Sequence, residues 1–367
     1  MTKFFTIVSV IMISALSAFS QRAKIEYIAH AAFVLESENG TRVLIDPYHS
    51  YNQLGYTFPE SIDADFVLIT HPHYDHDGSK YLSENVPVFR ESGMFRFKDV
   101  SFSGIESKHG FYEQIAASGN QAYNVIWVIE IGGKRIAHLG DNQTPTSEEI
   151  AKLESVDFII GPPNDEVLAL FPDKTYIPNH YLLPQLTKHQ NWMNPIDDWL
   201  IEKKQLNQLE SNVFFVNEKN RSGILLFQPS PLVKEWSPAY YKALDYMRQG
   251  LTIAREPEKK AEGLALLDMA IASVPNIFQP YLNKAILLDA GEQYVELIAV
   301  LEKGLASSID IDWGREVKAH SLLAKAYLNL EEKSKAYNHY LWIARHHRIV
   351  NTKTLEEAKT FINEYSE

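Results

Sequence analysis

Short apolar runs separated by turn residues fill the chain from Lys24 to about Gln228. Residues 25–36 and 42–46 flank Asn39-Gly40, a dipeptide typical of tight hairpin turns. Thr146, which follows Pro145, predicts the start of a helix. The other runs that we expect to form strands are 66–69, 125–130, 135–139, 156–160, 176–177, 213–216 and 224–227. This part of the chain therefore reads as a sheet-rich α/β unit.

The pattern changes after the proline-rich segment 228–238, and the rest of the chain reads as helical. Because residues that precede proline favour extended backbone, we place a linker at 231–238 between domains at 21–230 and 239–367. Positions with shared apolar or small character recur at the 34-residue period of tetratricopeptide repeats: Gly263, Leu267 and Ala270, then Leu297, Leu301 and Gly304.

The tail resembles tetratricopeptide repeats over about 240–350. A third unit contains Ala336 and Tyr340, and its longer spacing requires an insertion near 307–314. An ordinary bundle of helical hairpins is the alternative. Under either interpretation the helices bury apolar faces against one another, and a repeat surface could bind a protein partner, mediate self-association or cover the mouth of an active site.

Composition narrows the functional classes. The chain has 367 residues, of which 45% are hydrophobic, so it can bury two substantial cores. Its formal charge of −12 argues against nucleic acid as a partner. It contains no cysteine, which excludes disulfides, thiol catalysis and cysteine-ligated zinc. Any metal must be held by histidine and carboxylate side chains.

The first residues predict an exported protein. Lys3 precedes an apolar run over 4–19, and the small residues Ala18 and Ser20 suit signal peptidase, so we expect a cleaved signal peptide at 1–20 with Gln21 as the mature N-terminus. We therefore expect a periplasmic or secreted protein without a lipoprotein anchor, since no cysteine is available. The alternatives are an uncleaved membrane anchor and a cytoplasmic N-terminal helix.

A histidine-rich loop carries the candidate chemistry. The sequence 70–78 reads THPHYDHDG directly after the buried run 66–69, and it offers His71, His73, Asp75 and His76. Alternate residues of an extended loop project to the same side, so His71 and His73 can grip one cation while Asp75 and His76 turn toward a second. Imidazole and carboxylate are ligands of zinc or iron when thiols are absent. The competing interpretation is a solvated histidine-rich turn.

The H-x-H-x-D-H loop resembles the signature of the metallo-β-lactamase fold superfamily, a group of two-metal hydrolases. The remaining motifs of the group occur in the expected order: Asp46 in VLIDP, His109 in IESKHG, Asp141 in HLGD and His180 in YIPNHY. The resemblance implies a four-layer αββα sandwich before the helical tail. His138 competes with His109 for the third motif, and His189 competes with His180 for the fifth.

The resemblance implies a role for each matching residue. It places His71, His73 and His109 on the first metal, Asp75, His76 and His180 on the second, and Asp141 between them. Asp46 would orient a ligand histidine from behind. Asp75 is also the candidate catalytic residue, since it can orient the nucleophile or accept its proton. His30 and Tyr181 are candidates for the substrate pocket, although a buried core role is the alternative for His30.

The sequence thus predicts an exported hydrolase with two divalent cations, zinc by default and iron or manganese as alternatives. A hydroxide bridging the cations would cleave an ester, lactone, amide or phosphodiester of a small-molecule or lipid-like substrate. The segments AHAAF, HLGD and IPNHY resemble the ascorbate-phosphate-lactonase-like and phospholipase-D-like branch. The competing hypothesis is an exported scaffold in which the repeats bind a partner and the metal site is only structural.

Overall fold

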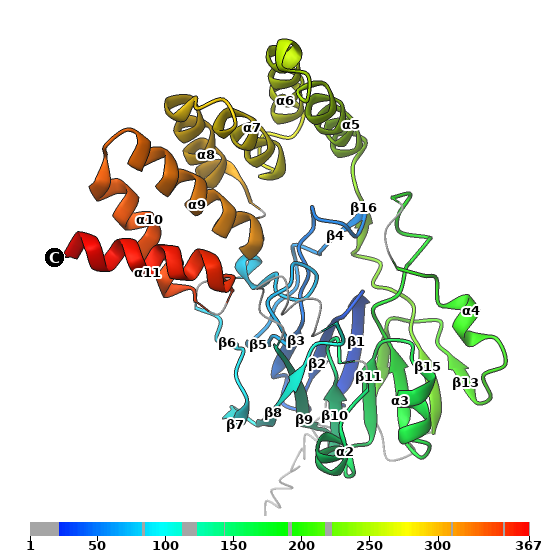
Figure 1. Cartoon of the computed structure of the whole chain (residues 1–367). Helices are drawn as coiled ribbons and strands as arrows, with labels where there is room; N and C mark the ends of the chain where they lie inside the picture. The colour runs from blue at the N-terminus through cyan, green and yellow to red at the C-terminus, as the bar shows by residue number, and fades with distance from the viewer. Residues whose placement is uncertain are drawn as a thin grey trace, which may run out of the picture.

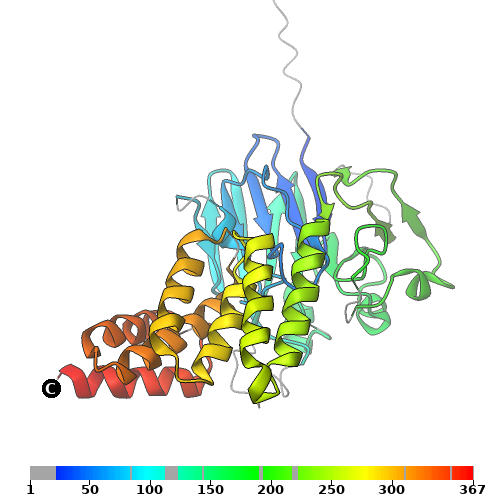
Figure 2. The ribbon, with the colours of Figure 1, turned by 90° about the horizontal axis from the view of Figure 1, so that it is seen from above.

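The computed structural model describes residues 22–82, 85–111, 123–142, 144–189, 193–216, 222–309, 311–347 and 349–366. The predicted signal peptide and its cleavage point lie outside these residues. Two β-sheets stack face to face, and a row of helices follows along one edge of the sandwich (Figures 1 and 2). No helix of the described residues is long and apolar enough to cross a membrane.

The first sheet has six strands in the order β14-β1-β2-β3-β5-β6. Its members β3, β5 and β6 run parallel, whereas β14, β1, β2 and β3 pair antiparallel. The Asn39-Gly40 turn joins β2 and β3 as predicted. The bounds are β1 Lys24–Ala29, β2 Ala32–Glu36, β3 Arg42–Ile45, β5 Phe66–Leu68, β6 Val88–Phe89 and β14 Val213–Phe215.

The second sheet has eight strands in the order β13-β15-β12-β11-β10-β9-β8-β7. Five neighbouring strands run parallel to one another: β13, β15, β12, β11 and β10. The pairs β10-β9, β9-β8 and β8-β7 are antiparallel. A two-stranded sheet pairs β4 Tyr56–Thr57 with β16 Lys234–Glu235. The bounds are β7 Gly93–Phe97, β8 Val100–Lys108, β9 Tyr123–Ile131, β10 Lys134–His138, β11 Phe158–Gly161, β12 Thr175–Pro178, β13 Leu206–Gln208 and β15 Gly223–Leu226.

Alternation along the strands produces three apolar layers. Inward side chains such as Phe33 and Trp127 form the core between the sheets. The outer face of the second sheet packs on helices α2 Ser147–Leu153 and α3 Asp165–Leu170. Loop residues such as Tyr48 and Met193 cover the outer face of the first sheet, beside the short helices η1 Ser79–Tyr81 and α4 Asp197–Leu200. The α/β sandwich expected from the sequence is therefore present.

The helical region consists of antiparallel pairs that stack on one another. Gly304 lies where α8 crosses α7, and an added Cβ there would stand 2.8 Å from Tyr281 Cβ, so the helices approach closely. The repeat positions Leu267, Ala270, Leu297 and Leu301 are buried as predicted. The bounds are α5 Pro238–Ile253, η2 Pro257–Lys259, α6 Lys260–Ser273, α7 Gln279–Asp289, α8 Tyr294–Ser307, α9 Trp313–Asn329, α10 Lys333–Arg345 and α11 Thr352–Ser366.

The segment predicted as a linker is packed rather than loose. Trp236 is 3% exposed, and its Nε1 donates to the Ser50 carbonyl oxygen at 2.6 Å. At the start of α5, the Tyr240 hydroxyl donates to the Tyr51 carbonyl oxygen at 3.1 Å. Arg315 Nη1, in the first turn of α9, donates to the same oxygen at 2.9 Å. The starts of α5 and α9 therefore both hold the loop that follows β3.

Candidate metal centre

The candidate ligands lie at one edge of the sandwich because of the strand directions. Asp46 follows β3, His71 follows β5, Asp141 follows β10 and His180 follows β12. These strands belong to the parallel portions of the two sheets, and the carboxyl ends of parallel strands commonly carry ligand sites. His109 follows β8 at the same edge. The topology thus brings together residues that are far apart in the sequence.

Three overlapping clusters offer ligand atoms within 4.8 Å of one another. The first contains His71, His73 and His109, the set predicted for the first metal. The second contains His30, Asp75, His76 and His180. The third contains His71, His76 and Asp141. All seven predicted ligands are therefore brought together, and His30 joins them.

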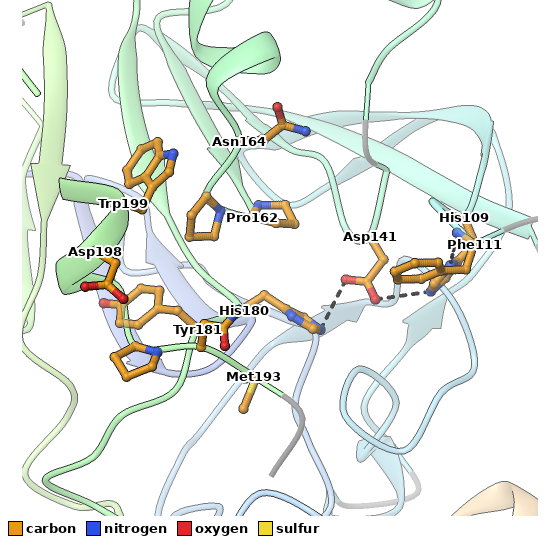
Figure 3. Close-up of a pocket in the computed structure, with 13 residues that line it drawn as sticks. His109, Phe111, Asp141, Pro162, Asn164, His180, Tyr181, Met193, Asp198 and Trp199 are labelled. Atoms are coloured by element: carbon orange, nitrogen blue, oxygen red, sulfur yellow. Dashed lines mark hydrogen bonds and ion pairs between the residues drawn. The ribbon is translucent and has the colours of Figure 1, made fainter. Parts of the chain in front are cut away.

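Asp141 faces both halves of the site with different oxygen atoms. Its Oδ2 lies 3.1 Å from His109 Nε2 and 3.7 Å from His71 Nε2. Its Oδ1 lies 3.1 Å from His76 Nε2. The same oxygen lies 3.4 Å from His180 Nε2 (Figure 3). A carboxylate divided in this way can bridge two cations, which is the role that the resemblance implies for it.

Hydrogen bonds behind the ligands fix which ring nitrogen faces the centre. His76 Nδ1 donates to Asp46 Oδ2 at 2.7 Å, which leaves His76 Nε2 free to bind a cation. Asp46 also accepts from the Thr70 amide at 2.8 Å and from the Thr70 hydroxyl at 2.7 Å. The hydroxyl oxygen in turn lies 3.0 Å from His71 Nδ1. Asp46 therefore stands where the sequence placed it, behind the ligands.

His30 is more than a pocket or core residue. The strand expected over 25–36 is instead β1 and β2 joined by a tight turn, in which His30 has a φ of +55°. This conformation turns the ring into the site, where His30 Nε2 lies 3.1 Å from Asp75 Oδ2. Asp46 and His180 also have positive φ, +45° and +56°. Backbone strain of this kind concentrates at functional sites.

The rival histidines lie elsewhere. His138 is a buried strand residue whose Nε2 bonds the Ala31 carbonyl at 3.0 Å while its Nδ1 accepts from the Gly140 amide at 3.1 Å, so both nitrogens are occupied. His189 packs on the Trp236 ring and is absent from the three clusters. The choice of His109 and His180 over these rivals agrees with the geometry.

The electrostatics of the centre are those of a cation site. Burial opposes charge on His76, but Asp141, Asp46 and Asp75 outweigh it and raise the pKa of His76 well above its usual value. Burial opposes charge on Asp141 too, and the histidines at 180 and 76 hold the pKa of Asp141 well below its usual value. Burial lowers the pKa of His71, helped by His76. A dense set of carboxylates among imidazoles attracts positive charge.

The donor set fits divalent cations. Among the described residues, His71 Nε2, His76 Nε2 and Asp141 Oδ1 are buried and have no partner with hydrogen-bond geometry. Buried polar atoms without such partners are costly and call for an explanation, which metal ligation supplies. Nitrogen and oxygen ligands suit zinc, iron or manganese. His71, His73 and His109 would hold one ion, Asp75, His76 and His180 the other, and Asp141 would contact both.

A pocket of about 560 Å³ opens directly beside the ligands (Figure 3). His109, Asp141 and His180 form its inner end. Its walls come from loops after β8, β11 and β12 and from the segment that leads into α4. The wall side chains are largely apolar: Phe111, Pro162, Pro163, Tyr181, Met193, Pro195 and Trp199. Tyr181 is therefore a pocket residue, as predicted.

The outer wall of this pocket was not predicted from the sequence. Pro162 and Pro163 follow the predicted strand 156–160, and Trp199 lies in a helix of only four residues. Neither feature has a spacing that points to a site. The sequence did offer one signal for Pro162 and Pro163: they follow a predicted strand, and this strand lies in the same sheet as the strand that leads into HLGD.

Comparisons with known proteins find a family domain and relatives that are metal-dependent hydrolases. Residues 24–175 match the model of the beta-lactamase superfamily domain. A UPF0173 metal-dependent hydrolase of Thermus thermophilus is 25% identical over 190 residues, which cover 43% of this chain and 83% of that protein. Another, from Methanosphaera stadtmanae, is 56% identical over 55 residues, 15% of this chain and only 24% of the relative.

The helical region is similar to the Arabidopsis OM64 TPR domain, at 14% identity and a TM-score of 0.29, over 35% of this chain and 98% of that one. A score this low carries no weight for function, and the repeats are identified from the chain's own period and packing. For the N-terminal part, the family match confirms the resemblance drawn from the sequence motifs.

Proposed function

We propose that this protein is a two-metal hydrolase of a small-molecule ester, lactone, amide or phosphodiester. The premise is that residues 24–175 form the beta-lactamase superfamily domain of a metal-dependent hydrolase. The observation that carries the two-metal proposal is the divided carboxylate of Asp141. One oxygen faces the His71 and His109 nitrogens, and the other faces those of His76 and His180. A site for one ion would not need both.

When bound, two divalent cations would polarise the substrate oxygen and activate a water molecule. The chain itself supplies orientation and proton handling. Asp75 Oδ2 lies 3.3 Å from His180 Nε2 and 3.1 Å from His30 Nε2, so its carboxylate is held at the centre. From there Asp75 can orient the attacking water and accept its proton. The largely apolar walls of the pocket would limit the access of bulk water to a bound substrate, which would strengthen these interactions.

A metal analysis combined with a substrate screen tests the proposal. Protein purified without added metal, then loaded with zinc, iron or manganese, should hold two ions per chain. It should hydrolyse at least one member of a panel of lactones, carboxylic esters, N-acyl amides and phosphodiesters. Asp75→Ala should abolish turnover while circular dichroism shows an intact fold. A single ion per chain would refute the two-metal proposal, and turnover by Asp75→Ala at the parent rate would refute the role of Asp75.

The scaffold hypothesis predicts a different result with the same protein. It requires bound metal without turnover of any panel member, and binding to a protein partner that survives His76→Ala. The short helical row is compatible with a partner surface, and we keep that role as an addition to catalysis rather than a replacement for it.

Export is the second part of the proposal and is supported by the sequence of residues 1–20 alone. N-terminal sequencing of the protein recovered from periplasm or culture medium tests it. A mature chain that begins at Gln21 is the expected result. A chain that retains residues 1–20 in the cytoplasm would refute it.

A further inference from the structure

The pocket beside the ligands has an uneven distribution of charge. Its outer part contains Asp198 and Trp199 from α4, on the opposite side from His109 and Asp141 (Figure 3). Asp198 is exposed, and no ion pair to it is found among the residues that the structure describes. No Lys or Arg lines the described part of the pocket. The sequences of 112–122 and 190–192, which adjoin lining residues Phe111 and Met193, contain none either.

The neighbouring positive charge is already neutralised. Lys203 Nζ lies 5.0 Å from the centre of the Trp199 ring and pairs with Asp165 at 2.9 Å. Lys203 does not line the pocket, whereas the carboxylate of Asp198 does. A substrate group that enters the outer part therefore meets aromatic and proline surfaces together with one negative charge.

We propose that the pocket takes an apolar substrate group without negative charge, and that it favours a group ending in a cation such as an ammonium. This inference rests on the proposed hydrolase and narrows its substrate class. An apolar chain gains from burial against Phe111, Pro162 and Tyr181. An ammonium end meets the Asp198 carboxylate and aromatic faces, both of which attract cations. A carboxylate or phosphate end would be repelled by Asp198 and would find no basic side chain.

Three matched esters test the proposal on the zinc-loaded full chain. The 4-nitrophenyl esters of heptanoic, 6-aminohexanoic and heptanedioic acid place a methyl, an ammonium or a carboxylate group, respectively, at the same position along the chain. We expect kcat/KM to be highest for the ammonium and lowest for the carboxylate. Each step should be roughly two- to fivefold, the size expected for one exposed charge a few ångströms away.

Variants of Asp198 identify the charge responsible. Asp198→Lys should reverse the preference between the ammonium and carboxylate esters, and Asp198→Asn should remove most of it. Asp173→Lys, at an exposed position outside the pocket, is the matched control and should leave the order unchanged. The proposal is overturned if the ester that ends in a carboxylate is hydrolysed as well as the ester that ends in a methyl group. It is also overturned if Asp198→Lys does not change the order of kcat/KM among the three esters.

A binding measurement separates this inference from the proposed activity. The methyl ketones of the same three chains cannot be hydrolysed, and calorimetry can measure their affinity with and without metal. If they bind in the predicted order but no ester is cleaved, hydrolysis of esters is wrong and the pocket assignment stands. If the ketones do not bind, or the carboxylate-ended ketone binds best, the pocket assignment is wrong.

Discussion

Asp46→Asn is the sharpest probe of the centre because it removes one charge and keeps the shape of the side chain. The backbone of Asp46 has a φ of +45°, a conformation that asparagine tolerates well, so the variant should not strain the turn. Asp46 Oδ2 accepts hydrogen bonds from His76 Nδ1 and from the Thr70 hydroxyl, both at 2.7 Å. An asparagine side chain has only one acceptor oxygen for these groups.

The magnitude follows from the lost contacts. A hydrogen bond to a charged group contributes about 1.5–3 kcal/mol, and the variant loses at least one of them. It also places an amide donor opposite His76 Nδ1, or forces the tautomer in which Nε2 carries the proton and cannot bind a cation. Loss of a partner behind a ligand histidine typically lowers metal affinity by about 10- to 100-fold. We expect that loss at the ion held by His76.

Stepwise zinc titration against a chromogenic chelator measures the effect. The affinity of the ion held by His76 should fall by about 10- to 100-fold. The ion held by His71, His73 and His109 should weaken less, since Asp46 reaches His71 only through Thr70. Asp99→Asn is the matched control: its carboxylate accepts hydrogen bonds from Asn39 and Thr41 outside the metal clusters. Equal affinities in Asp46→Asn and the parent would refute the orienting role.

Two further predictions concern the helical region. Gly304→Ala should lower the free energy of unfolding, measured in urea titrations, by about 1–3 kcal/mol. Alanine favours helices, but the added Cβ would stand 2.8 Å from Tyr281 Cβ. A variant as stable as the parent would show that α7 and α8 can move apart. Burial lowers the pKa of His320 to about 3, and the positive charges of His339, His346 and Lys80 lower it further. The neutral His320 ring therefore contributes its full stability above about pH 6.5, and this contribution is lost as the pH falls toward 3. His320→Phe can retain stacking on Trp342 and should therefore lose less stability between pH 7 and pH 5 than the parent; an identical loss would contradict this.

Most of the candidate ligands could be placed in advance because they follow strands that the sequence predicts, whereas the strand before His109 was not predicted. The loop after 66–69 and the order of Asp46, His109, Asp141 and His180 identified the residues before any contact was known. The rival His138 could be placed only by structure, since strand alternation permits either face and its bonds to Ala31 and Gly140 are specified by tertiary packing.

Other features required the folded chain. His30 enters the site through a left-handed turn between β1 and β2, in the stretch 25–36 that was expected to form one strand. The pocket wall comes from proline and tryptophan residues in loops, which carry no periodic signal. The first long helix begins at Pro238, directly after the proline-rich segment near 230, but proline content cannot reveal that Trp236 is buried.

The burial of Trp236 decides where the protein can be shortened for crystallisation or directed evolution. A chain truncated before residue 236 would leave the Ser50 carbonyl without its indole donor and would remove both donors to the Tyr51 carbonyl. Ending the chain within α5 would expose the surface that packs on α6. A shortened chain that keeps these three hydrogen bonds must therefore extend through α9, and insertions or fusion points belong beyond Asn329.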